Sequence, residues 1–316
     1  MEQEFRATVE RAISAYVADT YGLAGSVSTV IKGANWTFVA RDGVQDRAFI
    51  RLYRTCRRSA ADVASEMAVL LAVEDTPALD VSRPLIDREG RSFSTFELPD
   101  GTKRLLGVFA PAVGRELAAI TADWYRAGVA LSHLHRQTGL TPLAPNRELL
   151  SDTRDKETLA MIAEKSPRIA AEFSRSMDLL VDLGANKPIG PTGLCHGDVR
   201  PMNMRIQDER VAFFDFDDCG RGPQWLDVAA MALWLENMND GDAGALWRAF
   251  LGGYGLIESE PFVLFARWLV AEHQLRILRF LFDYCELDAA LWDVVLNRAE
   301  TTIGRAARSE LRAFVS

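Results

Sequence analysis

The spacing of apolar residues changes once along the chain, near residues 111–114. Before that point, short β-prone runs are separated by turn signals, among them Asp-Gly at 42–43 and Pro-Asp-Gly at 99–101. After it, apolar residues recur mainly at helical spacing. We therefore predict an α+β fold with two lobes: an antiparallel sheet with helices in residues 1–112, and a mainly helical lobe in residues 113–316.

The expected elements follow from these local patterns. In the first lobe we expect a helix over 5–17, two or three strands between 27 and 53, a helix from the Ser59 N-cap to Val73, and strands at 92–98 and 104–110. In the second lobe we expect helices at 121–136, around 148–180 and from 225 onward, with two short strands at 204–206 and 211–214.

Composition and charge argue against several classes of protein. The net charge of −8 opposes electrostatic binding of nucleic acid and mildly favours cationic substrates. No apolar run approaches the ~18 residues of a membrane span, and the N-terminal segment has helical rather than signal-like patterning. Four separated cysteines without a CxxC pair indicate neither a disulfide framework nor a zinc site: Cys56, Cys195, Cys219 and Cys285. We expect a cytoplasmic protein with no nucleic-acid or membrane partner, of unknown oligomeric state.

One loop carries residues suited to phosphoryl transfer. In the segment HGDVRPMN, Asp198 and Asn203 stand five residues apart, and Asp215 follows 12 residues later at the end of an apolar run. Phosphoryl transfer needs a carboxylate near the attacking hydroxyl and oxygen ligands for Mg²⁺ on the nucleotide phosphates. The pattern therefore favours a kinase site, with Asp198 as base and Asn203 and Asp215 holding metal. The alternative is a surface turn followed by a strand that ends in acidic residues.

These motifs resemble those of the aminoglycoside phosphotransferase and choline kinase superfamily, most of all its branch of type II homoserine kinases and bacterial stress-response kinases. HGDVRPMN is similar to that family's catalytic loop and FFDFDD to its metal-binding aspartate motif. GPQWLD at 222–227 and FLGGY at 250–254 resemble the start of its next helix and a recurrent C-terminal helix motif. The resemblance covers nearly the whole chain and implies a two-lobed, protein-kinase-like fold that uses ATP and Mg²⁺.

The resemblance also implies roles for individual residues. It makes Asp198 the catalytic base, Asn203 and Asp215 the Mg²⁺ ligands, and His196 and Asp227 structural supports of the loop. Asp227 stands near a predicted helix start, where a carboxylate can accept backbone N–H bonds, and this agrees with a supporting role.

Other residues near the loop keep open interpretations. Asp217 and Asp218 support the metal or face the substrate, or they are solvated loop and capping residues. Arg200 stands where small-molecule members carry histidine and protein kinases lysine; it either neutralises the transferring phosphate or is a surface cation. The helical segments at about 145–187 and 255–300 are expected to wall the acceptor pocket, with candidate contacts that are equally typical of a solvated face: Glu272, His273 and Asp283.

The first lobe offers candidate nucleotide contacts. VIKGANW resembles the family's nucleotide-covering loop and makes Lys32 a candidate, although its single glycine is also typical of a hairpin turn. Arg51 stands on the third strand, where kinases place a lysine for the α- and β-phosphates, and Glu66 on the next helix is its expected partner. Backbone groups of Ala110 and Ala112 are expected to bind adenine.

The sequence thus predicts ATP-dependent transfer of the γ-phosphoryl group to a hydroxyl of a small molecule: an amino alcohol, a hydroxy amino acid or an aminoglycoside-like compound. The first alternative is a Ser/Thr protein kinase of the stress-response type, although only about nine residues separate Asp215 from the next helix and leave little room for a peptide-docking segment. Arginine at position 51 supports a second alternative, a catalytically silent nucleotide-binding protein. A metal-dependent hydrolase built on the aspartates is a more remote one.

Overall fold

The computed structural model of the protein describes residues 2–55, 58–145, 147–150, 152–187, 190–238 and 241–314. Cys56 therefore lies outside the described residues. Contacts group the chain into two compact units. Unit 1 comprises Met1–Val73, Val81–Val113 and Leu143–Pro145, and unit 2 comprises Glu74–Asp80, Gly114–Pro142 and Asn146–Ser316. The assignment of nucleotide binding to residues 1–112 and of catalysis to residues 113–316 stays a prediction.

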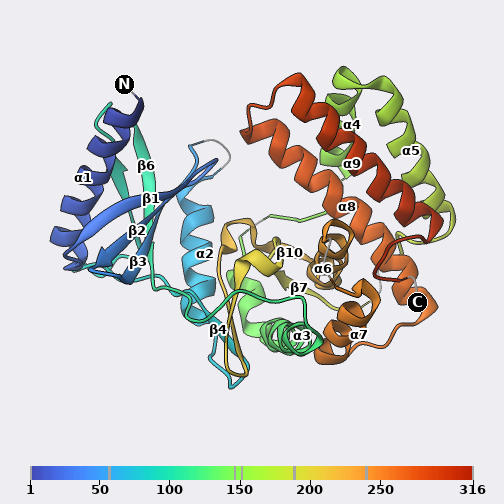
Figure 1. The fold of residues 1–316 in the computed structure, drawn as a ribbon, viewed down its shortest axis with the longest axis horizontal. Coiled ribbons are helices and arrows are strands. Elements are labelled where there is room, and N and C mark those ends of the chain that lie inside the picture. Colours follow the sequence, from blue (N-terminus) through green and yellow to red (C-terminus); the bar gives the residue numbers. More distant parts are fainter. Residues whose placement is uncertain are drawn as a thin grey trace. The chain divides into compact units, whose positions relative to one another are not determined.

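Unit 1 is built on a five-stranded antiparallel sheet with the order β1-β2-β3-β6-β5 (Figure 1). Its strands are β1 (Ser26–Lys32), β2 (Trp36–Asp42), β3 (Gln45–Leu52), β5 (Phe93–Glu97) and β6 (Lys103–Phe109). Two helices accompany the sheet, α1 (Glu2–Tyr21) and α2 (Ala60–Ala72). The predicted Ser59 cap is present, because its Oγ accepts from Asp62 N at 3.1 Å while Asp62 Oδ2 accepts from Ser59 N at 2.9 Å.

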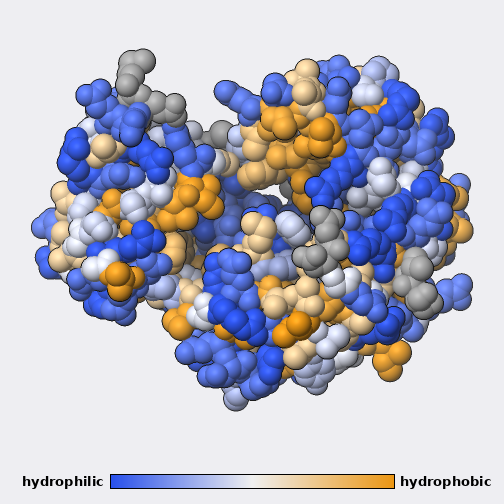
Figure 2. Space-filling view, in the orientation of Figure 1, coloured by the Kyte–Doolittle hydropathy of each residue, from blue (hydrophilic) through white to orange (hydrophobic). Residues whose placement is uncertain are grey.

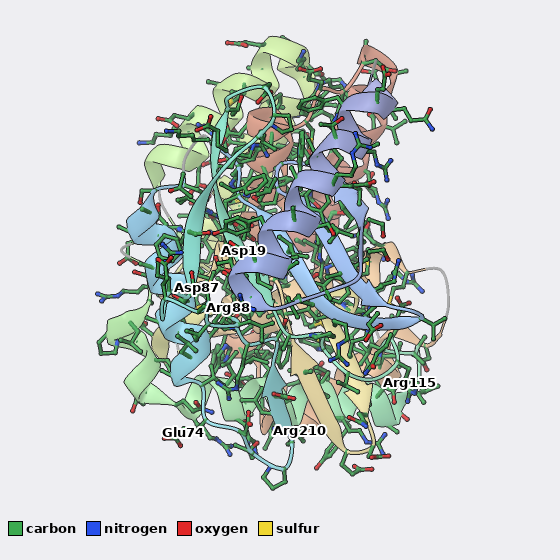
Figure 3. The ribbon with its side chains drawn as sticks, turned by 90° about the vertical axis from the view of Figure 1, so that its left-hand side faces the viewer. Asp19, Glu74, Asp87, Arg88, Arg115 and Arg210 are labelled. Carbon is green, nitrogen blue, oxygen red and sulfur yellow. The ribbon has the colours of Figure 1, made fainter. Side chains whose placement is uncertain are left out.

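Helix α1 covers one face of this sheet, across the strands (Figure 3). Its apolar stripe is buried against the sheet in a core that contains Val9, Ile13, Phe38, Ile50 and Leu106. The C-terminal end of α1 is also held by the chain before β5, since Arg88 N donates to Thr20 O at 3.0 Å. Helix α2 lies against the other face, where a Cβ added at Gly107 would come within 2.7 Å of the Met67 methyl group.

Unit 2 is mainly helical and carries two small sheets. Its helices are α3 (Thr121–Arg136), α4 (Asp152–Lys165), α5 (Pro167–Asp182), α6 (Trp225–Asn237), α7 (Ala243–Tyr254), α8 (Glu260–Tyr284) and α9 (Ala289–Arg308). One sheet has the order β4 (Leu79–Val81), β9 (Arg210–Phe213), β8 (Met204–Gln207), and the other pairs β10 (Gly220–Pro223) with β7 (Thr192–Cys195). Three 3-10 helices complete the set: η1 (Thr138–Leu143), η2 (Pro201–Asn203) and η3 (Phe216–Asp218).

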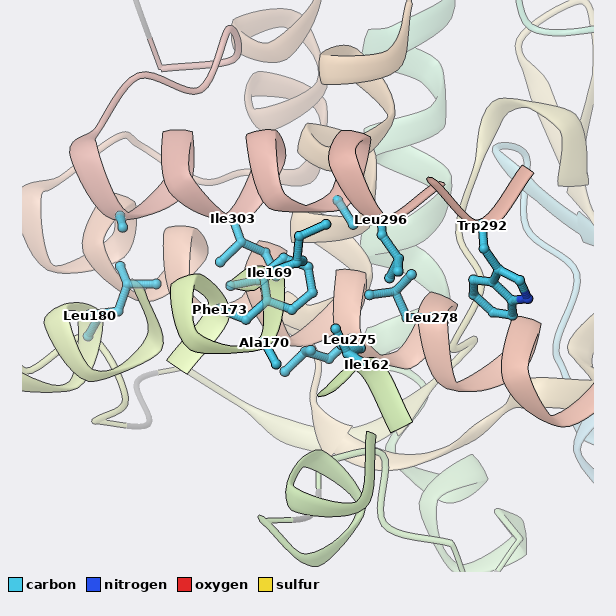
Figure 4. Close-up of a cluster of buried hydrophobic side chains, with 14 residues drawn as sticks. Ile162, Ile169, Ala170, Phe173, Leu180, Leu275, Leu278, Trp292, Leu296 and Ile303 are labelled. Carbon is cyan, nitrogen blue, oxygen red and sulfur yellow. The ribbon is translucent and has the colours of Figure 1, made fainter. Parts of the chain in front are cut away.

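Helices α4, α5, α8 and α9 enclose the apolar core drawn in Figure 4. Phe173, Leu278 and Ile303 are completely buried in it, and each such side chain contributes about 1.5–3 kcal/mol of transfer free energy. Figure 2 shows that apolar side chains also gather on the surface over the start of α9, where Leu291 and Val294 are exposed. Among the described helices, none combines the length and the apolar character needed to cross a membrane.

Helices α3 and α7 approach each other backbone to backbone. A Cβ added at Gly128 of α3 would lie 2.1 Å from Phe250 O, and one added at Gly253 of α7 would lie 2.0 Å from Tyr125 O. Both distances are far below any real Cβ contact, so only glycine permits this crossing. The FLGGY segment therefore owes its second glycine to helix packing.

The predicted α+β class is correct, with an antiparallel sheet in the N-terminal part and helices in the C-terminal part. The helical stretch predicted around residues 148–180 is present as two helices, α4 and α5, and begins at Asp152. Ser166 caps α5 by accepting from Ile169 N, and Pro167 follows at the first helical position. The helix is therefore interrupted between α4 and α5. Glu148 instead forms a parallel bridge with Arg221. Strands β7 and β10 were not predicted.

Candidate functional site

The predicted catalytic loop joins β7 to β8 within unit 2. It begins after Cys195 and ends in η2, where Asn203 directly precedes β8. Gly197 has a φ of +85°, and a Cβ there would lie 2.1 Å from Asp218 O. The glycine thus allows the loop to pass against the segment that follows Asp215.

Asn203 fixes the position of Asp198. Its Nδ2 donates to the main-chain oxygen of Asp198 at 2.9 Å and to Asp198 Oδ2 at 2.8 Å. The Asn203 side chain is 3% exposed, and its own main-chain oxygen accepts from Phe214 N at 3.1 Å. Because the amide nitrogen faces Asp198, the amide oxygen Oδ1 is turned away from that carboxylate.

Arg200 lies against the same carboxylate. Its Nε is 3.1 Å from Asp198 Oδ2 in an ion pair that lacks hydrogen-bond geometry, and its guanidinium carbon is 5.9 Å from the centre of the Trp234 ring. Burial raises the pKa of Asp198 to about 7; the charge of Arg200 opposes this rise, and the carboxylates of Asp215 and Asp218 add to it. A carboxylate with a pKa near neutrality is suited to accept a proton from a hydroxyl.

Asp215 follows β9 in a left-handed backbone conformation, with φ 70° and ψ 57°. Residues other than glycine adopt this region at a cost, although aspartate and asparagine tolerate it best. The conformation turns the chain sharply from β9 into η3. It is a local feature that the spacing of the motif does not reveal.

Asp227 holds the start of the catalytic loop. Its Oδ2 accepts from His196 N at 2.6 Å, and its Oδ1 accepts from Gly197 N at 2.9 Å. His135 Nε2 lies 3.1 Å from the same Oδ2. Burial alone would raise the pKa of Asp227, but the hydrogen bond and the charge of His135, with further help from His196 and Gly197, bring it below its usual value. The carboxylate therefore stays ionised.

His196 braces the loop from within. It is completely buried, its Nε2 lies 3.0 Å from Phe214 O, and its Nδ1 lies 3.3 Å from Asp198 N. Burial lowers the pKa of His196 and keeps the ring neutral. A neutral ring with its proton on Nε2 donates to Phe214 O and accepts from Asp198 N, so it links the loop to the end of β9.

Two residues on other helices extend this support. His135, near the end of α3, places its Nδ1 2.8 Å from the hydroxyl of Tyr254 at the end of α7. Gln224 Nε2 donates to His135 O at 2.9 Å. Because His135 Nε2 faces Asp227, a chain of contacts runs from α7 through α3 to the catalytic loop.

Arg147 anchors the acidic segment after Asp215. Its Nη1 donates to Asp217 O at 3.0 Å and lies 3.8 Å from Asp218 Oδ1. Its main-chain oxygen accepts from Arg221 N at 2.9 Å, next to the edge of β10. Asp217 is 7% exposed, which excludes a simply solvated carboxylate at that position.

Unit 1 brings Arg51 and Glu66 together. Arg51 Nη1 lies 3.1 Å from Glu66 Oε1, and the hydroxyl of Tyr53 donates to Glu66 Oε2 at 3.0 Å. The side chains of Arg51 and Glu66 are 12% and 3% exposed. The guanidinium also lies over the ring of Phe109 at 5.2 Å, which limits its conformations.

The other candidate residues of unit 1 differ in their surroundings. Lys32 is exposed, with its ammonium 5.2 Å from the centre of the Trp36 ring. Ala110 already uses its amide, which donates to Arg83 O at 2.8 Å, and its oxygen accepts from Ser82 Oγ at 2.6 Å. The Ala110 N–H is therefore not available to adenine.

Comparison with known proteins identifies the family. The model of a phosphotransferase enzyme family, APH, matches residues 30–262. The chain belongs to this family. The phosphotransferase is also 29% identical over 255 residues, covering 77% of its own chain and 72% of the other, to an uncharacterized protein of Deinococcus radiodurans. The family assignment agrees with the resemblance seen in the catalytic loop.

Solved structures share the fold of the phosphotransferase at low sequence identity. Amicoumacin kinase hAmiN, in complex with AMP-PNP, Ca²⁺ and Ami, has a TM-score of 0.74 and 18% identity, covering 100% of this chain and 98% of that one. A microcompartment-associated aminopropanol kinase has a TM-score of 0.75 and 20% identity, covering 96% and 99%. Spectinomycin phosphotransferase APH(9)-Ia, with ADP and spectinomycin, has a TM-score of 0.61 and 13% identity, covering 96% and 98%.

The phosphotransferase contains supporting residues that sequence reasoning did not assign to the site. His135 contacts Asp227 and Tyr254 contacts His135 in turn, although neither residue was named as a site candidate from the sequence. Arg147 received no role at all. The FLGGY motif was a signal for Tyr254, whereas the contacts of His135 and Arg147 are tertiary and leave no local pattern. Glu272 is 4% exposed on α8 and is therefore no part of a solvated face.

Proposed function

We propose that the phosphotransferase moves the γ-phosphoryl group of ATP to a hydroxyl of a small molecule, with Asp198 as the general base. The observation that carries this proposal is the double hydrogen bond from Asn203 to Asp198. These bonds fix the Asp198 carboxylate, whose pKa is raised, next to the Asn203 amide, whose oxygen is turned away from Asp198. An acceptor hydroxyl at Asp198 would lose its proton to that carboxylate as its oxygen attacks phosphorus.

Asn203 and Asp215 are the proposed Mg²⁺ ligands. Their donors are an amide oxygen and a carboxylate, the oxygen ligands that Mg²⁺ prefers, and phosphate oxygens of the nucleotide would complete the set. Among the described residues, no cluster of three or more His, Cys, Asp or Glu side chains is arranged to hold a metal ion by itself. When bound, Mg²⁺ neutralises charge on the phosphates.

Unit 1 supplies the proposed nucleotide contacts. Arg51, held by Glu66, is assigned to the α- and β-phosphates, and its permanent charge and planar fork replace the usual ammonium group. Lys32, the last residue of β1, is a second proposed phosphate contact. The carbonyl of Ala110 and the backbone of Ala112 are the proposed adenine contacts, since the amide of Ala110 is engaged elsewhere.

A small acceptor is favoured by the segment between Asp215 and α6. This segment consists of η3 and of β10, which pairs along its length with β7 from Cys195 to Thr192. Little chain is left there to form a peptide-docking segment of the kind that protein kinases use. The amicoumacin, aminopropanol and spectinomycin enzymes that share the fold also carry small-molecule acceptors in their names.

The test is Mg²⁺-dependent conversion of ATP to ADP in the presence of pooled small hydroxyl compounds, with Asp198→Asn as the comparison. We expect turnover only when both Mg²⁺ and the pool are present, and a loss of at least about 100-fold in the variant. ATP binding without turnover across small-molecule and protein panels would instead support the silent nucleotide-binding alternative, which the arginine at position 51 favours. Phosphate release that needs no acceptor would support a hydrolase.

A further inference from the structure

Helix α8 carries two polar side chains that have buried atoms without a hydrogen-bond partner among the described residues. These atoms are Nδ1 of His273 and Nη1 of Arg276. The two residues are three positions apart and share one face of the helix. His273 is 3% exposed, and Arg276 is partly exposed as a whole residue although its Nη1 is buried.

This face of α8 lies close to the catalytic loop. The charges that act on His273 include those of Arg276, Asp227, Arg200 and Asp218. Arg276 also acts on the thiol of Cys195, the residue directly before the loop. Within unit 2, α6 and α8 pack against each other, and the loop residue Arg200 lies over Trp234 of α6. Helix α8 thus packs against the helix that supports the loop, and His273 and Arg276 interact electrostatically with residues at the loop.

Both unpartnered atoms are suited to donate a hydrogen bond. Arg276 has N–H donors and no acceptor, and its charge is permanent. Burial lowers the pKa of His273 to about 3, so its ring is neutral and one nitrogen carries a proton. Native proteins rarely leave buried donors without partners, and such atoms next to a reaction centre call for a ligand that accepts hydrogen bonds.

We propose that Arg276 and His273 bind a carboxylate on the acceptor, so that the substrate is a hydroxy acid rather than a simple amino alcohol. This rests on the proposed kinase function. Arg276 would offer the charge-assisted hydrogen bond and His273 a second, neutral one, and together they would orient the acceptor hydroxyl toward Asp198. His273 and Arg276 are specificity-determining residues in this reading, since the transferred group does not touch them.

A singly charged anion fits these surroundings better than a phosphate ester. Asp227 and Asp218 are the carboxylates among the charges that act on His273. Both oppose a second negative charge on the ligand. The net charge of −8 favours cations over the molecule as a whole, whereas Arg276 supplies a positive charge next to His273.

The experiment compares alcohols that differ only by a carboxylate: L-serine with ethanolamine, L-threonine with 1-amino-2-propanol, and L-homoserine with 3-amino-1-propanol. For at least one pair, we expect kcat/KM to be about tenfold or more higher for the acid. The variant Arg276→Gln should lower that preference by about tenfold or more through the KM of the acid, with less than twofold change in the KM for ATP. His273→Phe should do the same more weakly.

Arg279→Gln is the matched control on the next turn of α8, because its guanidinium is paired with Asp283 at 3.0 Å and Glu157 at 2.9 Å. It should leave the preference unchanged. A wild-type preference for the amines, or an unchanged preference in Arg276→Gln, would overturn the carboxylate site while the kinase function stands. O-phosphoserine used better than serine would point to a phosphate instead. No turnover with any alcohol, including a wider pool, would reject the kinase function itself.

If thermal unfolding shows that Arg276→Gln does not fold, inhibition of the wild-type enzyme still tests whether the site prefers a carboxylate. L-2-aminobutyrate and propylamine differ only in the carboxylate and have no hydroxyl to phosphorylate. The proposal requires the acid to compete with the acceptor at a concentration about tenfold or more lower than the amine. Equal inhibition contradicts it.

Discussion

Asn203 donates two hydrogen bonds from one nitrogen to Asp198, at 2.9 Å to the main-chain oxygen and at 2.8 Å to Oδ2. The two residues are therefore one geometric unit, in which the orientation of the carboxylate depends on the amide. A change at Asn203 acts on the proposed base and on the proposed metal ligand together.

Replacing Asn203 by alanine should reduce turnover by about 100-fold or more, because it removes a ligand and releases Asp198 from its fixed orientation. The apparent Mg²⁺ concentration for half-maximal rate should also rise. Steady-state kinetics over a range of Mg²⁺ concentrations provide the measurement. Asn297→Ala is the control, since Asn297 on α9 donates to Asp293 O within its own helix and accepts from the exposed Arg168 Nη2 at 3.5 Å. Equal activity of the two variants would remove Asn203 from the site.

Replacing Arg51 by lysine tests whether arginine is a functional substitute. If Arg51 binds phosphate, Arg51→Lys should keep kcat within a few-fold, whereas Arg51→Ala should raise the KM for ATP about tenfold or more. Initial rates at varied ATP give both constants. Arg41→Ala is a matched control on the neighbouring strand, where Arg41 forms a half-exposed pair with Asp46 at 2.7 Å. An alanine variant with unchanged ATP affinity would show that position 51 is structural.

The two adjacent glycines of α7 should respond in opposite directions to alanine. Gly253→Ala forces a methyl group against Tyr125 O, so we expect it to lower the free energy of unfolding by about 2–4 kcal/mol. Gly252 has open space around it, and Gly252→Ala should be neutral or stabilise by up to about 1 kcal/mol through helix propensity. Urea denaturation of both variants measures the difference. Similar effects would mean that α3 and α7 are less close than described.

Asp123 should make the stability depend on pH in the acid range. It is fully buried, and hydrogen bonds from Arg115, together with an amide hydrogen bond from Ala118, hold the pKa of its carboxyl below the usual value against the effect of burial. A pKa lowered in the folded state stabilises the protein above the unfolded pKa of about 4, and this contribution disappears as the pH falls through the folded value. Asp123→Asn should have a lower free energy of unfolding than wild type at pH 7. In urea titrations, this difference in unfolding free energy should become smaller below about pH 4. A difference that is constant with pH would exclude an ionised Asp123.

Much of the catalytic loop could be predicted from the sequence because its residues are close neighbours along the chain. Asp198 and Asn203 are five positions apart, so the loop that joins them brings them into contact. The capping of α2 was equally local, since Ser59 and its partner Asp62 belong to one turn. Arg51 and Glu66 could be paired because strand β3 leads directly into α2.

The features of the fold and the site that were not predicted depend on contacts between segments far apart in the sequence. His135 reaches Asp227 across 92 positions, and the sequence around it, LSHLHRQ at 131–137, does not distinguish it from a packing residue. Strands β7 and β10 escaped prediction because Gly193, Gly220 and Pro223 have low strand propensity, and only their mutual pairing makes them extended. The left-handed conformation of Asp215 likewise depends on where the chain must go after β9, which the neighbouring residues do not indicate.

The glycine crossing of α3 and α7 links remote packing to the chemistry of the loop. It sets the separation of the two helices whose ends carry His135 and Tyr254, and His135 in turn holds Asp227 beneath the loop. In a random mutagenesis screen for lost activity, substitutions at Gly128 and Gly253 should therefore accumulate alongside those at Asp198, although neither glycine contacts a substrate. Compensating second-site changes should arise in the facing turns of α3 and α7 rather than in the loop.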